Sequence, residues 1–264
     1  QNPLESRGAQ RRTWIGLACC PTNFARIIPQ IGGFAYATQN GDVCVNLFMN
    51  GKAAIALDGG KSVTLKQETA YPWDGKVKLT VVPKEASEFA VRLRIPGWAL
   101  GRPIPSDLYR YADSAAPPVN LKVGGEKVDA TCEADGYVRL QRFWNPGDVI
   151  ELDLPMPVRR VYAHRNIQGN RGKVSLMRGP IIYCFEGADN PDVVFAETRI
   201  PVDAEVVAEH RGELLGGLTV LRTEGRNKAD RPVALTAIPY YAWTNREKGP
   251  MTVWMEEESL NKSD

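Results

Sequence analysis

Residues 136–154 read GYVRLQRFWNPGDVIELDL, and this stretch indicates the fold class. Apolar and polar residues alternate on both sides of NPGD, a pattern typical of two half-buried strands separated by a turn. Similar short segments, rich in β-branched residues and often separated by Asn-Gly or Asp-Gly turns, run through the chain after residue 34. They are residues 42–48, 52–57, 62–69, 76–82, 88–95, 136–143, 148–154, 172–178, 180–186, 217–223 and 232–238.

Many short strands without intervening helices predict a mainly β fold rather than a parallel α/β sheet. A chain of 264 residues is long enough for two such domains, each with its own core. We therefore expect two antiparallel β-sandwich (jelly-roll-like) domains, at residues 37–158 and 159–264, preceded by residues 1–36. Residues 101–119 and 187–191 are predicted to be loops.

One segment has helical periodicity, residues 18–33, which read ACCPTNFARIIPQIGG. Cys20 is expected at the N-cap and Pro21 at the first helical position. Pro29 should kink or end the helix, and the pair at 32–33 should close it. Its apolar residues fall at the i, i+3, i+4 and i+7 spacing of one helical face: Phe24, Ile27, Ile28 and Ile31.

Composition excludes two classes of partner. Lys and Arg number 33 against 31 Asp and Glu, so the chain lacks the basic stripe that nucleic-acid binding requires. No apolar stretch approaches the roughly 20 residues of a membrane span. The first residues are polar and do not resemble a signal peptide. Because the chain does not start with Met, we expect the natural N-terminus to lie upstream or to have been removed.

The cysteines and histidines do not form a recognisable framework. Five cysteines at irregular spacing argue against a set of disulfides. Cys44 and Cys184 lie in strand-like segments and are expected to be buried as small hydrophobic residues, and Cys132 has no special context. His164 and His210 are far apart in sequence with no companion ligands, so they do not predict a zinc site.

The adjacent pair Cys19-Cys20 permits a sharper hypothesis. Neighbouring cysteines rarely close a disulfide because the ring is strained, but both thiolates can reach one metal ion. A helix N-terminus favours the thiolate, and a bound zinc ion lowers the pKa of a coordinated thiol further. From the residues alone, two thiols packed at a helix start are the commoner explanation.

The stretch of residues 2–48, which includes this pair, resembles glycoside hydrolase family 127, the β-L-arabinofuranosidases. Further segments that are similar to this family lie at 92–99, 136–156, 172–190 and 237–254, so the resemblance runs nearly end to end. The family signature W-x-G-x-ACCP-x-N-x-x-R corresponds to Trp14, Gly16, Ala18, Cys19, Cys20, Pro21, Asn23 and Arg26.

The resemblance implies a chemistry and a fold. Family members have an (α/α)-barrel catalytic domain followed by β-sandwich domains, so residues 1–36 would be the helical remnant of that barrel. By position, Cys19 corresponds to the nucleophile and a zinc ligand, and Cys20 to a second zinc ligand. The other zinc ligands and the acid/base Glu come from upstream segments in that family. The resemblance therefore implies a partner, the missing N-terminal catalytic barrel, a carbohydrate substrate, and a 264-residue chain without activity of its own.

The remaining polar and aromatic residues are interpreted as structural. Glu186 and Asp148 are expected at strand ends and turns, and no spaced acid pair stands out. The tryptophans of the β region are expected to pack in cores more often than to bind sugars. Tyr240 and Tyr241 are interpreted in the same way. The tryptophans concerned are Trp73, Trp98, Trp144, Trp243 and Trp254.

Three interpretations of function remain open at this point. The first is the C-terminal part of a retaining glycosidase. The second is a non-catalytic carbohydrate-binding or accessory β-sandwich protein, and the third is a structural zinc protein. A large apolar surface around residues 1–36 would favour the first, whereas exposed coplanar tryptophans would favour the second.

Overall fold

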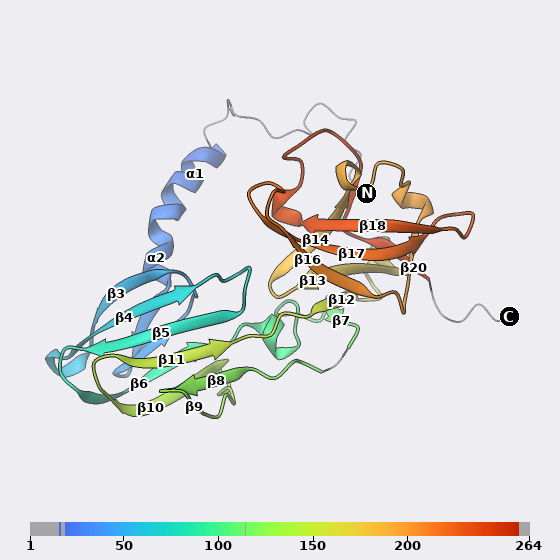
Figure 1. Ribbon diagram of the computed structural model, residues 1–264. Coiled ribbons are helices and arrows are strands. Elements are labelled where there is room, and N and C mark those ends of the chain that lie inside the picture. The colour runs from blue at the N-terminus through green and yellow to red at the C-terminus, as the bar shows by residue number, and fades with distance from the viewer. Residues whose placement is uncertain (1–15, 17–18, 114, 259–264) are drawn as a thin grey trace. The chain divides into compact units, whose positions relative to one another are not determined.

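The computed structural model describes residue 16 and residues 19–113 and 115–258 (Figure 1). These residues form two compact units. Residues 16–101 and 116–156 make up the N-terminal unit, and residues 102–115 and 157–258 make up the C-terminal unit. No helix in these described ranges is long and apolar enough to cross a membrane.

The N-terminal unit begins with the predicted helical segment. Helix α1 spans Cys19–Ile27, a 3-10 turn spans Ile28–Gln30, and α2 spans Ile31–Phe34. The predicted interruption at Pro29 is confirmed, because the α-helix changes to 3-10 geometry there. The predicted stop at Gly32 and Gly33 is wrong. Both glycines lie inside α2, and the C-cap is Ala35, whose N–H donates to Gly32 O at 3.3 Å.

Two sheets follow in the same unit, and most of their strands match the predicted segments. The four-stranded sheet has the order β1 (Tyr36–Gln39), β2 (Asp42–Val45), β6 (Ser87–Arg94), β10 (Tyr137–Trp144). The six-stranded sheet has the order β3 (Gly51–Ala56), β4 (Ser62–Thr69), β5 (Lys76–Pro83), β11 (Asp148–Asp153), β8 (Asn120–Val123), β9 (Glu126–Lys127).

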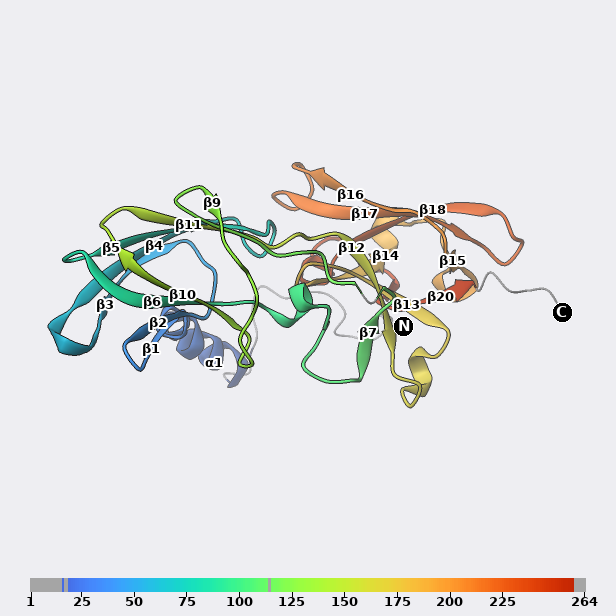
Figure 2. The ribbon, with the colours of Figure 1, turned by 90° about the horizontal axis from the view of Figure 1, so that it is seen from below.

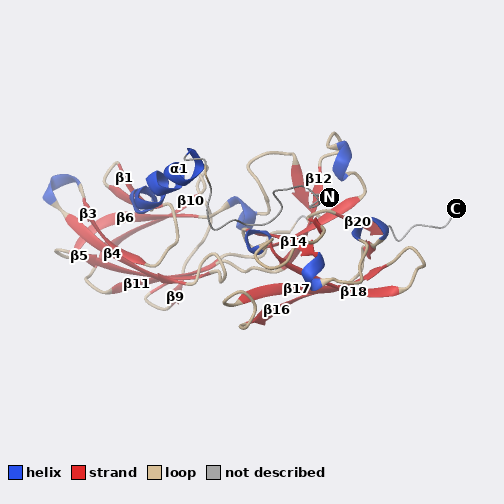
Figure 3. Cartoon of the chain, turned by 90° about the horizontal axis from the view of Figure 1, so that it is seen from above, coloured by secondary structure: helices blue, strands red, loops and turns tan. Residues whose placement is uncertain are grey.

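The two sheets face each other across one hydrophobic core, as Figure 2 shows. Residues of β4 and β5 alternate between buried and more exposed positions, so each strand turns one face to the core. Members from both sheets include Val91, Trp144, Leu65 and Ile150. Helix α1 lies on the side of the four-stranded sheet that faces away from this core (Figures 2 and 3).

The pairing of these strands differs from the prediction in one respect. Strands β2 and β6 are parallel, so the sheet is not purely antiparallel. No pairing of individual strands was predicted: β10 pairs with β6, and β11 pairs with β5 and β8, so the two strands of residues 136–154 lie in different sheets. The predicted turn between β1 and β2 is confirmed. Asn40 and Gly41 have φ of 53° and 80°, the left-handed pair of a type I′ hairpin.

The C-terminal unit is a ten-stranded sheet. Its four short 3-10 turns are Gln168–Asn170, Gly187–Asp189, Phe195–Glu197 and Tyr240–Ala242. Its strands are β7 (Tyr109–Tyr111), β12 (Val158–Ala163), β13 (Lys173–Arg178), β14 (Ile181–Glu186), β15 (Arg199–Pro201), β16 (Val206–Arg211), β17 (Leu218–Arg226), β18 (Pro232–Pro239), β19 (Met251–Thr252) and β20 (Met255–Glu258).

Six of these strands close into a barrel. The pairings run β14-β18-β17-β15-β20-β13, and β13 pairs back with β14. The predicted second antiparallel sandwich is therefore wrong, and the β15–β20 pair is parallel. Short alternating strands suit a sandwich and a barrel equally, and closure removes edge strands. The barrel core includes Leu176, Tyr183, Phe185, Ile200 and Leu235.

Gly225 permits strand β15 to lie close to strand β17 in this barrel. A Cβ at this position of β17 would lie 2.6 Å from Leu235 Cδ1 and 3.0 Å from the carbonyl oxygen of Arg199 in β15. The absent side chain therefore lets the short strand β15 pair with β17 next to the core.

The segment predicted as a long loop, residues 101–119, is not entirely irregular. Strand β7 lies within it and pairs with β12 at Tyr111↔Val161 and Ala163↔Tyr109. The chain therefore enters the C-terminal unit briefly at β7, returns to the N-terminal unit for β8 to β11, and then re-enters at β12. The domain boundary that we predicted between 158 and 159 stays a prediction.

Candidate functional site

The cysteine pair opens helix α1. Cys19 is the first helical residue and Cys20 the second, so the prediction of Cys20 at the N-cap is wrong. Pro21 is consequently the third helical residue. The first N–H groups of a helix have no intrahelical partner, and a proline is tolerated throughout this turn. Pro21 therefore indicates the helix start only to within a residue or two. Trp14 and Ala18 of the signature lie outside the described residues.

The two thiols are close and accessible. Their Sγ atoms lie 3.7 Å apart, both residues are exposed, and no disulfide joins them. Two thiolates bound to one tetrahedral zinc ion at about 2.3 Å each would be separated by about 3.8 Å. The observed separation thus fits a pair of zinc ligands without rearrangement of the helix start.

Two neighbouring side chains hold the backbone of this turn. Asn23 Nδ2 donates a hydrogen bond to the carbonyl oxygen of Cys19 at 2.8 Å, and Thr22 Oγ1 donates to the same oxygen at 3.2 Å. The signature residue Asn23 therefore fixes the peptide that carries the first cysteine. Gly16 and Arg26, also in the signature, are exposed.

The apolar face predicted for this helix exists, but it is not buried. Its side chains remain between 37% and 65% exposed: Phe24, Ile27, Ile28, Ile31 and Phe34. A contiguous apolar surface beside two exposed thiols is typical of an interface with another protein element. This is the surface that favours the first interpretation of function.

The other thiols are not candidates for nucleophilic chemistry. Cys44 and Cys184 are buried, as predicted. Burial raises the pKa of the Cys44 thiol. Burial also raises the pKa of the Cys184 thiol to about 12, and the negative charges of Glu186 and Asp189 add to the effect. Both thiols are therefore protonated at neutral pH. Cys132 is partly buried.

Further metal ligands for Cys19 and Cys20 do not come from the described part of the chain. Within it, no group of three or more His, Cys, Asp or Glu residues is arranged to hold a metal ion. The pair would fill two positions of a tetrahedral zinc site, and the other two positions would need ligands from outside the described residues.

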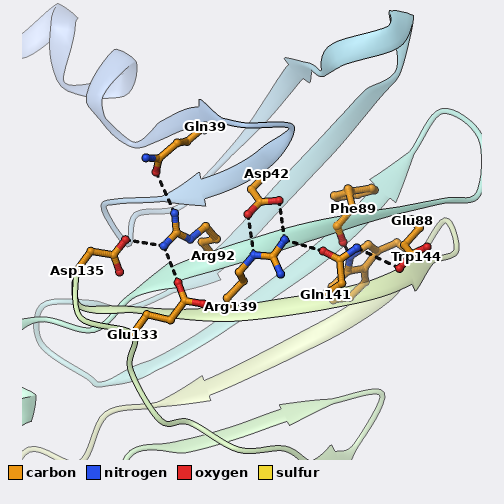
Figure 4. Close-up of polar contacts among 10 residues, drawn as sticks. All are labelled: Gln39, Asp42, Glu88, Phe89, Arg92, Glu133, Asp135, Arg139, Gln141 and Trp144. Carbon is orange, nitrogen blue, oxygen red and sulfur yellow. Dashed lines mark hydrogen bonds and ion pairs between the residues drawn. The ribbon is translucent and has the colours of Figure 1, made fainter.

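Arginines bridge pairs of carboxylates at three places in the described part of the chain. On the outer face of the four-stranded sheet, Arg92 is 8% exposed (Figure 4). Its Nη2 lies 2.7 Å from Glu133 and 2.5 Å from Asp135, and its Nη1 donates to Gln39 at 2.9 Å. Nearby, Arg139 pairs with Asp42 at 2.8 Å. Arginines occupy the oxygens of these carboxylates, so we assign the network a structural role.

The second carboxylate pair lies in the C-terminal unit. Glu186, the last residue of β14, is fully buried, and its oxygens accept from Thr244 N at 2.9 Å and Arg246 Nη2 at 2.7 Å. Arg246 also binds Asp189 at 2.7 and 2.5 Å. Glu186 is at a strand end, as predicted, but its role as a buried anchor was missed. Asp148, the first residue of β11, accepts from Asn145 N at 2.9 Å and is a strand-end residue, as predicted.

The aromatic residues divide between core and surface. Trp98 and Trp144 are core residues, as predicted, whereas Trp73 is 56% exposed in the β4–β5 turn. The rings of Tyr240 and Trp243 stack at 6.0 Å. Among the described tryptophans only Trp73 is more than half exposed, so these residues do not form a platform of exposed tryptophans. Tyr240 and Tyr241 are 44% and 46% exposed, so the prediction of core packing is wrong for these two residues.

The described residues therefore contain an exposed thiol pair at a helix start, followed in the sequence by many short strands. Comparison with known proteins assigns its class. Residues 42–156 match the model of the family 127 β-L-arabinofuranosidase middle domain, and residues 158–256 match the glycoside hydrolase family 127 C-terminal domain. The chain belongs to glycoside hydrolase family 127. The cysteine pair precedes the first matched residue, so these two matches do not test it.

Individual relatives agree with this assignment. The chain is 34% identical over 274 aligned residues to the non-reducing end β-L-arabinofuranosidase of Bifidobacterium longum subsp. longum, covering 93% of this chain and 38% of that protein. A solved family 127 β-arabinofuranosidase is 37% identical with a TM-score of 0.85, over 94% of this chain and 40% of that one. The corresponding values for the β-L-arabinofuranosidase of Geobacillus stearothermophilus T6 are 36%, 0.83, 97% and 40%. The chain thus spans about two fifths of the length of these relatives.

Proposed function

We propose that this chain is the C-terminal part of a retaining, zinc- and cysteine-dependent glycoside hydrolase that acts on β-L-arabinofuranosides of plant-type glycans. The observation that carries the proposal is the pair of exposed thiols at the start of α1, with their sulfur atoms 3.7 Å apart. The relatives' names, β-arabinofuranosidase and β-L-arabinofuranosidase, support the substrate class.

In this proposal Cys19 is the nucleophile and Cys20 is a zinc ligand beside it. A zinc ion bound by both sulfurs would supply positive charge that keeps a coordinated thiol ionised at neutral pH. The Cys19 sulfur forms a bond to the anomeric carbon while the glycosidic C–O bond breaks and an acid protonates the leaving oxygen. Water then displaces the sulfur, so two inversions retain the configuration. Asn23 would orient the Cys19 peptide through its 2.8 Å hydrogen bond.

The proposal includes a partner, an N-terminal catalytic barrel that covers the apolar face of α1. Such a barrel would supply the acid/base Glu and the missing zinc ligands. The exposed Phe24, Ile28 and Phe34, which are 65%, 59% and 54% exposed, are consistent with a surface that packs against another domain. Residues 1–36 would then be the barrel's helical remnant, with domains at 37–158 and 159–264 and a jelly-roll-like sandwich in the first of these.

The alternative proposal is a carbohydrate-binding accessory protein without catalytic residues. It requires exposed aromatic rings side by side. Among the described tryptophans only Trp73 is more than half exposed, and Tyr240 and Trp243 stack on each other. The apolar face of α1 favours the enzyme instead.

Two variants of a longer protein that carries this chain test the proposal. Cys19→Ser should nearly abolish hydrolysis of an aryl β-L-arabinofuranoside, because a serine hydroxyl ionises far less readily than a thiol. Cys20→Ser should mainly weaken zinc retention, with activity partly restored by added zinc. Cys132→Ser, a partly buried cysteine outside the pair, is the matched control. Near-normal turnover in well-folded Cys19→Ser would refute the assigned mechanism.

The 264-residue chain provides a second test. It should show no turnover and at most weak zinc binding, since two thiolates leave zinc under-coordinated and the acid/base Glu would come from the proposed barrel. Clear hydrolysis by the pure chain would contradict the proposal of a partner domain.

A further inference from the structure

One pocket in the C-terminal unit is lined mainly by basic side chains. It has a volume of about 440 Å³ and lies in the C-terminal unit, where β7, β12 and β20 meet the turn between β12 and β13, drawn yellow in Figure 2. Its charged and polar lining comes mainly from Arg110, Tyr162, His164, Arg165, Arg171 and Lys173. We refer to it as the arginine pocket. It shares no residue with the cysteine site.

The three arginines of the pocket have no carboxylate partner among the described residues. Arg110 Nη1 donates to the carbonyl oxygen of Tyr111 at 3.5 Å, and Arg171 Nη2 donates to the carbonyl oxygen of Arg165 at 3.2 Å. The Arg165 side chain makes no hydrogen bond within the described ranges. Elsewhere in the C-terminal unit, arginines such as Arg246 are paired with acids at 2.5–2.7 Å. Unpaired guanidinium groups around one pocket leave its positive charge available to a ligand.

The carboxylate that lines the pocket does not neutralise these arginines. Glu257 is bound by Arg160 Nη1 at 2.7 Å, and the Tyr162 hydroxyl donates to the same oxygen at 3.0 Å. Burial, together with the hydrogen bond to Glu257, raises the pKa of Tyr162 to about 12, so this hydroxyl keeps its proton at neutral pH. Lys173 contacts Glu256 at 3.7 Å, a long and partly exposed pair. The pocket therefore keeps a net positive charge.

One guanidinium group is already oriented. The Arg110 guanidinium carbon lies 5.1 Å from the centroid of the Tyr162 ring, within the range of a cation–π contact. This contact holds the planar fork in a fixed direction, and a guanidinium fork matches the two oxygens of a carboxylate. The pocket volume also falls within the about 300–1,000 Å³ typical of small-molecule sites.

We propose that the arginine pocket binds the carboxylate of an acidic sugar, a uronic acid residue of a glycan, through Arg110, Arg165 and Arg171. The choice of a glycan rests on the proposed function, since a glycoside hydrolase meets anionic ligands mainly as charged sugars. The site would tether the protein to acidic polysaccharide at a place separate from the cysteines.

Binding of digalacturonic acid to the full 264-residue chain tests this inference by isothermal titration calorimetry. The neutral disaccharide galactobiose and inorganic phosphate are the comparison ligands. We expect digalacturonate to bind at least about tenfold more tightly than galactobiose, and its affinity to fall between about 0.02 and 0.3 M salt. Because no hydrolysis is measured, failure of the catalytic proposal leaves this result interpretable.

The variant Arg165→Gln/Arg171→Gln should lose about tenfold or more in affinity, since charge-assisted hydrogen bonds are lost. Arg231→Gln, an exposed arginine outside the pocket, makes a change of the same kind and should bind normally. The single variant Arg165→Gln serves if the double variant does not fold. Tighter binding of phosphate than of digalacturonate, equal binding of both disaccharides, or no effect of the pocket variants would overturn the proposal.

Discussion

The buried cluster of Glu186, Asp189 and Arg246 leads to a quantitative prediction about the C-terminal unit. Replacement of Arg246 by Met keeps most of the side-chain volume but removes the charge. Two acids then lose their partner, and their side chains are only 0% and 7% exposed, so water cannot replace the arginine. Breaking a buried pair by removing one partner costs about 3–5 kcal/mol of unfolding free energy.

The expected loss lies near the middle of that range. Three charge-assisted hydrogen bonds disappear, at 2.7, 2.7 and 2.5 Å, but the Arg246 side chain is 23% exposed and therefore partly screened. We expect about 4 kcal/mol, which corresponds to a fall of about 16 °C in the melting temperature of a unit this size. The Arg246–Asp189 contact also raises the pKa of Arg246, against the effect of burial, so the arginine stays charged at any accessible pH.

Amide hydrogen exchange of β14, which reports on the C-terminal unit alone, measures this loss. The matched control is Arg222→Met. Arg222 pairs with Glu209 at 3.2 Å, but both side chains are well exposed, at 56% and 40%, and such pairs contribute about 0–1 kcal/mol. If Arg246→Met reduces protection no more than Arg222→Met does, the buried cluster does not stabilise the unit and the reasoning is refuted.

Three further predictions follow from packing and ionisation. Trp144→Leu should lower the unfolding free energy of the N-terminal unit by about 3 kcal/mol in urea unfolding, because Trp144 is fully buried and its Nε1 donates to Phe89 O at 3.0 Å; a loss below about 1 kcal/mol would contradict this. Because both side chains are more than half exposed, we expect the apolar face of α1 to make the 264-residue chain self-associate, and Phe24→Ser/Ile28→Ser to reduce this association in analytical ultracentrifugation with stability nearly unchanged; a monomeric unaltered chain, or equal association of the two proteins, would argue against an apolar contact surface. The thiol of Cys184 keeps its proton in the folded state up to about pH 12 but ionises near pH 9 when unfolded, so its contribution is complete below pH 9 and is lost as pH rises toward 12. Cys184→Ala should therefore reduce the alkaline loss of stability by up to about 1.4 kcal/mol per pH unit in that window, and an unchanged slope in pH-dependent urea unfolding would refute the raised pKa.

Local patterns predicted the strands and the helix but not their pairing. The segments at 62–69 and 76–82 alternate in the sequence and alternate in burial, because period 2 follows directly from strand geometry. Strands β12 and β16 were missed, since their residues include charged side chains that interrupt the alternation. Barrel closure through β13 and β14 depends on pairing between distant segments, and no local pattern encodes it.

The sequence predicted the cysteine pair of the candidate site but not the arginine pocket. Cys19 and Cys20 came from adjacency and a family signature, and their 3.7 Å separation agrees with the hypothesis without testing it. The arginine pocket could not have been predicted, because Arg110 and Arg165 are 55 positions apart in the sequence and meet only through the pairing of β7 with β12. Isolated arginines among other residue types do not indicate that their side chains line one pocket.

Strand β7 belongs to the C-terminal unit but is synthesised before β8 to β11 of the N-terminal unit. This order has a consequence for biosynthesis. Strand β7 ends at Tyr111, and its partner strand β12 begins at Val158, which is 47 positions later in the chain. Tyr111 therefore leaves the ribosome well before β12 does. At about 5–20 residues per second, β7 waits roughly 2–10 s without its partner. During that time the intervening residues 116–156 can complete the N-terminal unit. Vectorial synthesis thus orders the two folding events, and a chaperone that shields β7 during this interval would protect the edge that β12 later covers.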